Sequence, residues 1–255
     1  MTVPISIQLY TLREAAQQDF PAVLARLGDI GYVGVEPAGL HDLTPAAFRK
    51  CVDDAGLVVS GAHIPLLTDE NANALLDMQE TLGNRDVVVA FLPAERFANA
   101  DSVKRVADDL NASNEIARGR GLALGYHNHN WEFAYRIDGR TAHATLFDQL
   151  EPGIFAEIDT YWARVGGVDP ARIVSDLGER ARMLHLKDGP ADDPESPMTA
   201  VGSGVLDVAA IAAASRADWH VVELDRCATD MFEAVEQSYR FLVENGLARG
   251  RARAT

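Results

Sequence analysis

The fold is decided by the stretch that joins SVKRVADDLNASNEIARGRG (102–121) to LALGYHN (122–128). Apolar residues recur in its first part at three- and four-residue spacing, which predicts a helix lying against a sheet. The segment ends in Gly121, and glycine is the residue type that most often follows the last turn of a helix. The run after it is short and rich in β-forming residues. This pairing indicates a helix followed by a strand, the repeating unit of a parallel sheet.

The same alternation extends to both ends of the chain. Other helical segments include 20–31 and 231–246, and further segments end in glycine at Gly31, Gly56 and Gly246. We expect eight strands, at 5–10, 32–37, 57–64, 86–92, 122–128, 154–160, 182–188 and 220–225. Eight strand–helix units predict a single (β/α)8 TIM barrel, with residues 1–255 as one domain. An open parallel sheet would need a glycine-rich phosphate loop after its first strand, and SIQLYTLRE (6–14) contains no glycine.

Composition limits the classes of partner. The 255 residues are 47% hydrophobic and 24% charged, as in ordinary globular proteins, and the formal net charge is −15. Nucleic-acid binding requires basic surfaces, so we expect no nucleic-acid partner. No run approaches the roughly 20 apolar residues of a membrane helix, and MTVPISIQLYTL (1–12) does not resemble a signal peptide. The two cysteines are far apart, which favours a reduced, cytoplasmic setting. Assembly into a homo-oligomer is compatible with this composition.

Polar side chains stand where the predicted strands end, and active sites of such barrels lie at that end. These residues are Gln8, Glu36, His63, His127, His129, Asp159, His185, Lys187, Glu223 and Asp225. Imidazoles and carboxylates from neighbouring strands suit one divalent metal ion, such as Mn²⁺, Co²⁺, Fe²⁺, Zn²⁺ or Mg²⁺. Any one of these histidines, taken alone, is more often a structural core residue. The combination favours a metal site.

Several nearby residues have two interpretations. Glu157 either supports the ligands or pairs with an arginine inside the barrel. Trp131, Phe133, Tyr161 and Trp162 form either an apolar wall against a sugar or a hydrophobic plug. The irregular segment 188–204 is a candidate lid, with Gly202–Gly204 as a plain turn before a helix capped by Asp207. We expect His41, His143 and His220 to be structural or exposed.

Several motifs, spread along nearly the whole chain, together resemble those of a known family. They include QLYTLRE (8–14), GYVGVEPAG (31–39), YHNHNWEF (126–133), EIDTYWARVGGVDP (157–170), LHLKDG (184–189) and VVELD (221–225). Together they resemble the sugar phosphate isomerase/epimerase superfamily of xylose isomerase-like TIM barrels, in a YHNH-type branch. The resemblance implies metal-dependent enzymes that move protons between adjacent carbons of ketoses, cyclitols and related keto-sugars.

The resemblance also implies a ligand set. Asp159, His185 and Glu223 match the family's metal ligands on strands six, seven and eight. The strand-five position falls on His127, where other members have a glutamate. This departure weighs against a symmetric pair of glutamates acting as acid and base on opposite faces of the substrate.

We therefore expect a metal-dependent isomerase or epimerase that acts on a ketose, inosose or keto-sugar through a metal-stabilised enediolate. Glu223 is the expected base, with Glu132 as a second candidate. Lys187 or His63 would steady the enediolate or return a proton. The expected substrate-binding residues are Gln8, Glu36, His129, Trp131 and Trp162.

Three alternatives use the same residues. One is a lyase or dehydratase, or an enzyme that cleaves keto-glycosides, in which a β-substituent leaves after proton abstraction. Another is a metal-dependent hydrolase related to endonuclease IV, which the negative charge disfavours. The third is a barrel that binds a sugar without turning it over.

Overall fold

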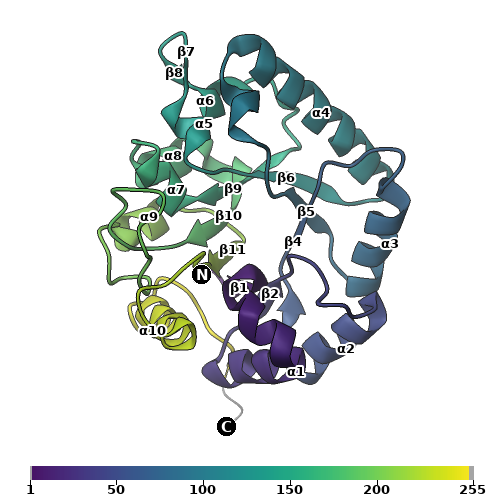
Figure 1. Ribbon diagram of the computed structural model, residues 1–255, viewed down its shortest axis with the longest axis vertical. Coiled ribbons are helices and arrows are strands. Elements are labelled where there is room, and N and C mark those ends of the chain that lie inside the picture. Colours follow the sequence, from purple (N-terminus) through teal and green to yellow (C-terminus); the bar gives the residue numbers. More distant parts are fainter. Residues whose placement is uncertain (1, 253–255) are drawn as a thin grey trace.

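Parallel strands form a nearly closed ring surrounded by helices in the computed structural model, which describes residues 2–252 (Figure 1). The ring contains β1 (Ile5–Gln8), β2 (Gly34–Glu36), β3 (Val58–Val59), β4 (Ala62–Ile64), β5 (Asp86–Val89), β6 (Ala123–His127), β9 (Phe155–Asp159), β10 (Ala181–Leu186) and β11 (Trp219–Val222). Hydrogen-bonded neighbours follow the order β3-β2-β1-β11-β10-β9-β6-β5-β4. Since β1 pairs with β11, the two ends of the chain meet in the ring. The expected (β/α)8 barrel is confirmed.

The strand expected at 57–64 is divided into β3, which pairs with β2, and β4, which pairs with β5. Between them the chain passes close to the barrel interior at Gly61. A Cβ atom there would lie 2.8 Å from Met183 Cε and 2.9 Å from Glu36 Oε1, so a larger residue would displace them. The eight expected strands thus become nine. The chain passes through Gly61 from β3 to β4, which are the two ends of the hydrogen-bonded order.

Helices surround the ring on its outer side (Figure 1). They are α1 (Arg13–Ile30), α2 (Pro45–Asp54), α3 (Ala72–Leu82), α4 (Ala100–Gly119), α5 (Trp131–Ala134), α6 (Ala142–Phe147), α7 (Thr160–Val165), α8 (Pro170–Leu177), α9 (Val208–Ala214) and α10 (Met231–Glu244). Short 3-10 turns occur at η1 (Leu9–Leu12), η2 (Ala94–Phe97) and η3 (Gly178–Arg180), and β7 (Arg136–Ile137) pairs with β8 (Arg140–Thr141) as a small hairpin. Gly121 follows α4 with φ +74°, the left-handed conformation expected of a glycine after a helix.

Two details of the sequence interpretation are tested by the helices. The helix expected at 20–31 begins earlier, at Arg13, and is kinked at Asp19, two residues before Pro21. Asp207 caps α9, as expected, by accepting a hydrogen bond from the amide of Ala210.

No helix in the described part of the chain has the length and apolar character that crossing a membrane requires.

The interior of the barrel is layered from apolar to polar. Val88, Phe155, Met183 and Val221 form a separate buried apolar cluster. Alternate residues of a strand share a face, so Met183, His185 and Lys187 follow one another along the inside of the ring. Phe155 and Glu157 repeat this order on β9. The apolar cluster therefore lies directly beneath the polar side chains at the carboxyl ends of the strands.

His143 is structural, as expected. Its ring lies between those of Phe133 and Phe147, at 4.5 Å from each, and its Nε2 atom has no hydrogen-bond partner. Burial lowers the pKa of His143 to about 3, with a smaller contribution from Arg180. The folded protein thus keeps the imidazole neutral where the unfolded chain would protonate it.

We predict that His143→Phe makes stability less dependent on pH. The folded-state pKa is depressed, so the unfolded chain binds the extra proton and stability falls as pH drops below about 6.5. The wild type should lose about 2 kcal/mol through this group between pH 7 and pH 5, and the variant should not. Urea unfolding at both pH values measures this. Equal losses in the two proteins would contradict the assignment.

Candidate active site

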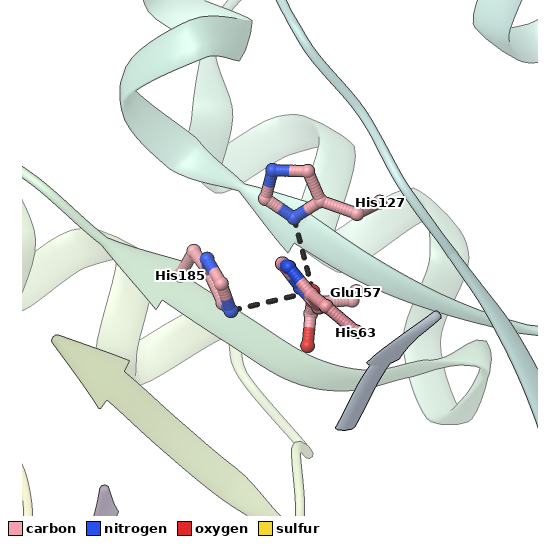
Figure 2. A group of neighbouring side chains, drawn as sticks. All are labelled: His63, His127, Glu157 and His185. Carbon is pink, nitrogen blue, oxygen red and sulfur yellow. Dashed lines mark hydrogen bonds and ion pairs between the residues drawn. The ribbon is translucent and has the colours of Figure 1, made fainter. Parts of the chain in front are cut away.

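Four side chains from four strands converge at the carboxyl end of the barrel (Figure 2). His63 comes from β4, His127 from β6, Glu157 from β9 and His185 from β10. One oxygen, Glu157 Oε2, lies 2.6 Å from His63 Nε2, 3.0 Å from His127 Nδ1 and 3.3 Å from His185 Nε2. We call these four residues the inner set. Three imidazoles therefore surround a single buried carboxylate.

A second group lies next to the inner set and shares two of its residues. His127, Asp159, His185 and Glu223, which we call the outer set, also bring one ligand atom each within 4.8 Å of one another. Asp159 ends β9 and caps α7, because its side chain accepts a hydrogen bond from the amide of Trp162. Glu223 Oε2 lies 2.7 Å from His185 Nδ1. These are the four residues predicted to hold a metal ion.

Lys187 supplies a buried ammonium group to the outer set. Its Nζ lies 3.0 Å from Asp159 Oδ2, 2.8 Å from Glu223 Oε2 and 2.7 Å from Asp225 Oδ2. Burial would lower the pKa of Lys187, but the three carboxylates outweigh it and raise that pKa well above its usual value. The lysine is therefore protonated at neutral pH.

The carboxylates differ in protonation because their partners differ. Burial would raise the pKa of Glu223, but Lys187 and His185 outweigh it, and the pKa lies well below its usual value. The pKa of Glu157 is likewise low, because His185 and His63 outweigh burial. Burial raises the pKa of Glu36 to about 7, and Glu157 adds to the rise. The site thus contains one carboxylate with a raised pKa and two with lowered pKa values, all within reach of the His185 imidazole.

The donor atoms fit a divalent ion. Glu36 Oε1 and Glu157 Oε1 are buried and have no hydrogen-bond partner among residues 2–252. Buried carboxylate oxygens without a partner are costly, so the cluster is incomplete without a further donor or a cation. Imidazole nitrogens with carboxylate oxygens are the ligands that Zn²⁺, Co²⁺, Mn²⁺ and Fe²⁺ accept. Burial lowers the pKa of His127 to about 4, which leaves this imidazole neutral and able to coordinate a metal.

A cavity of about 670 Å³ opens above the cluster. Its polar lining comes from His63, His127, His129, Lys187, Glu223 and Asp225. Its apolar wall comes from Tyr10, Ala38, Ile64, Pro65, Ala90 and Phe91. Tyr10 and Phe91 are exposed, at 44% and 56%. The sequence interpretation missed both, because it followed polar residues at strand ends, whereas these aromatic residues lie two residues past the ends of β1 and β5.

The other predicted residues lie behind the cavity wall. Gln8 donates to Glu36 Oε2 at 3.0 Å, and the same oxygen lies 2.7 Å from His185 Nε2. Glu132 accepts from the Tyr126 hydroxyl at 2.6 Å and from the amide of His129 at 3.0 Å. These three predicted residues contact groups beside the cavity and do not line it.

The expected aromatic wall is also placed differently. Trp131 stacks on His129 with ring centres 4.4 Å apart, and Trp162 lies beneath Lys187, whose Nζ is 5.3 Å from the ring centre. Neither tryptophan lines the cavity, and Phe133 and Tyr161 are fully buried. The candidate lid, 188–204, contributes no residue to the cavity lining either.

Comparison with known proteins identifies the family. Residues 23–219 match the xylose isomerase-like TIM barrel family, and the chain belongs to it. It is 28% identical over 181 residues to 2-epi-5-epi-valiolone 7-phosphate 2-epimerase of Actinoplanes sp. (strain ATCC 31044 / CBS 674.73 / SE50/110). That match covers 70% of this chain and 62% of the relative, less than two thirds of its length.

Solved structures show the same architecture. A sugar phosphate isomerase/epimerase from Parabacteroides distasonis ATCC 8503 is 26% identical, with a TM-score of 0.81 over 98% of this chain and 96% of the other. The IolI protein, solved with a binding zinc atom, is 16% identical, with a TM-score of 0.67 over 96% of this chain and 97% of the other. The likeness to IolI shows the fold alone.

We predict that Lys187→Met destabilises the metal-free protein by about 3 kcal/mol, since removing one partner of a buried ion pair leaves the carboxylates uncompensated. Urea unfolding in the presence of a chelator measures this. Lys104→Met is the matched control, because Lys104 pairs with Asp108 on the exposed face of α4, where ion pairs contribute little. Equal losses in the two variants would show that the Lys187 network does not stabilise the fold.

Proposed function

We propose that this protein is a metal-dependent isomerase or epimerase of a ketose, inosose or related keto-sugar. The observation that carries the proposal is the cluster of imidazoles and carboxylates at the floor of the 670 Å³ cavity. The names of the Actinoplanes and Parabacteroides relatives, an epimerase and a sugar phosphate isomerase/epimerase, support this reaction class.

The outer set of His127, Asp159, His185 and Glu223 would hold the ion. A divalent ion bound there would polarise a substrate carbonyl and acidify the adjacent C–H bond. Asp159 is held by the N-terminus of α7, and Glu36 orients the ring of His185. We propose Glu36, together with Gln8, as positioning residues that fix this ring.

Glu223 is the proposed base. Its carboxylate lines the cavity and its low pKa keeps it ionised at neutral pH. After it takes a proton from the carbon, the Lys187 ammonium, which lines the same cavity, would stabilise the negative charge on the enediolate oxygen. Lys187 or His63 would return a proton. Addition of the proton at another carbon or on the other face completes the isomerisation or epimerisation.

Glu132 fits a positioning role better than a catalytic one. Both of its oxygens already accept hydrogen bonds, from Tyr126 and from the amide of His129. It fixes the loop that presents His129 to the cavity, and Trp131 supports the same imidazole by stacking. We propose that His129 contacts the substrate and that Glu132 and Trp131 act through it.

The cavity favours a sugar without a phosphate group. Lys187 is the single lysine or arginine among the cavity-lining residues, and three carboxylates already surround it. A phosphate would meet more negative than positive charge there. The rings of Tyr10 and Phe91 instead offer apolar surfaces to the C–H face of a neutral sugar.

We predict that Glu223→Gln abolishes the proton-transfer step while the protein stays folded. The assay incubates the Mn²⁺-loaded protein with a panel of unphosphorylated ketoses and inososes in D₂O and follows deuterium incorporation into substrate carbon by NMR. The wild type should exchange at least one substrate, and the variant should lose about 10²-fold or more in rate, the range of general-base catalysis.

Glu233→Gln, an exposed position in the first turn of α10, is the matched control and should exchange at the wild-type rate. Full exchange by the Glu223 variant would remove Glu223 from the base role. Exchange with loss of water would instead identify a lyase, the alternative reaction of the same site.

A further inference from the structure

The two ring nitrogens of His127 face different carboxylates, and so do the two ring nitrogens of His185. His127 Nδ1 lies 3.0 Å from Glu157 Oε2, whereas its Nε2 lies 3.8 Å from Asp159 Oδ2. His185 Nε2 faces Glu157 at 3.3 Å, whereas its Nδ1 faces Glu223 at 2.7 Å. The two rings therefore stand between the inner and outer sets, and each set has its own nitrogen from each ring.

The outer set already contains a cation. The ammonium of Lys187 lies within 3.0 Å of the carboxylate oxygens of Asp159 and Glu223, both of which belong to that set. A metal ion entering the outer set would have to displace this ammonium or share its carboxylates with it. Like charges at such distances repel strongly inside a protein.

The inner set contains no competing lysine or arginine. Within residues 2–252, Glu157 and Glu36 make their polar side-chain contacts to histidines and to Gln8. Glu157 is fully buried, and its Oε1 atom has no hydrogen-bond partner in the described part of the chain. The charge of the inner carboxylates is thus balanced by imidazoles alone, which release their protons to solvent when a metal ion binds.

The spacing of the inner donors suits a small ion. Nitrogen and oxygen ligands of tetrahedral zinc lie about 2.0–2.1 Å from the metal, which places neighbouring ligand atoms about 3.4 Å apart. The three nitrogens lie 2.6, 3.0 and 3.3 Å from Glu157 Oε2, so outward movement of His63 and, to a lesser extent, of His127 would admit an ion. Figure 2 shows the rings of His127 and His185 directed toward the Glu157 carboxylate.

We propose that His63, His127, Glu157 and His185 form a divalent transition-metal site with three imidazoles and one carboxylate, filled when the cavity holds no substrate. This inference rests on the proposed function in that both require the cluster to bind a metal. It makes Glu157 a ligand and assigns the outer carboxylates, in that state, to Lys187. A neutral imidazole coordinates through one nitrogen and carries a proton on the other. An ion bound to the inner nitrogens of His127 and His185 therefore takes the place of one bound to their outer nitrogens.

Counting the imidazoles bound to Co²⁺ in the wild-type protein tests the proposal without any substitution. X-ray absorption of the Co²⁺-loaded, substrate-free protein reports the number of coordinated imidazoles. The inner set predicts three, and the outer set predicts two. Three imidazoles support the proposal, and two overturn it.

Substitutions identify the carboxylate. We expect His63→Gln and Glu157→Gln to raise the Kd for Co²⁺ more than about tenfold, since even indirect supporting residues of a metal contribute that much. Asp159→Asn is the matched variant, because an asparagine preserves the cap of α7, and it should change the Kd less than about threefold. Calorimetric titration gives each Kd, and circular dichroism shows that each variant is folded. If Glu157→Gln does not fold, His63→Gln and the imidazole count decide.

The outcomes separate this inference from the proposed function. Two imidazoles, with weaker binding in Asp159→Asn and unchanged binding in His63→Gln, would overturn the inner site and leave the outer site in place. Failure of the wild type to bind Co²⁺ would overturn both the inner site and the metal dependence of the proposed reaction. Deuterium exchange, measured separately with and without metal, tests the reaction itself.

Discussion

Burial of four carboxylates at one end of the barrel is the constraint on which the rest of the site depends. Glu36, Glu157, Asp159 and Glu223 are all at most 4% exposed. A buried charge is tolerated only when hydrogen bonds and opposite charge compensate it. The imidazoles of three strands and the ammonium of Lys187 provide this compensation, and the oxygens still without partners leave a place for a metal ion.

The barrel produces this concentration of charge through the two-residue period of its strands. Along β10 and the residue that follows it, the inward side chains run from Met183 to His185 to Lys187, and on β9 from Phe155 to Glu157 to Asp159. The apolar residues fill the interior below and exclude water there. Each step of two residues toward the carboxyl end brings a more polar layer, and Lys187 in the last layer lines the cavity. Fold stability and site chemistry are therefore encoded in the same strands.

Much of this arrangement could be predicted from the sequence because it depends on local order. The strand–helix alternation predicts the barrel, and polar residues at strand ends predict which side chains share one rim. The break at Gly61 could not be predicted, since it depends on the approach of Met183 from the opposite side of the ring. The role of Glu157 was left open for a similar reason. An inward glutamate pairs with whatever the other strands present, and the interpretation allowed an arginine where the structure has three histidines.

Which carboxylates Lys187 contacts, and which ones the histidines contact, likewise depends on distances across the barrel. LHLKDG (184–189) predicts that His185 and Lys187 face the same way, but it does not indicate that the ammonium meets Asp159, Glu223 and Asp225. Side chains that act through contacts, such as Glu132 behind His129, look the same in the sequence as those that face the cavity. Tyr10 and Phe91, on the cavity wall, carry no polar signal at all.

The central claim is that the shared imidazoles of His127 and His185 hold a divalent metal at the floor of the cavity. Anomalous diffraction from crystals grown with Co²⁺, recorded above and below the cobalt edge, tests it most directly. We expect one strong peak within coordination distance of both rings. A map without a peak at these histidines, from protein that binds cobalt elsewhere or not at all, would contradict it.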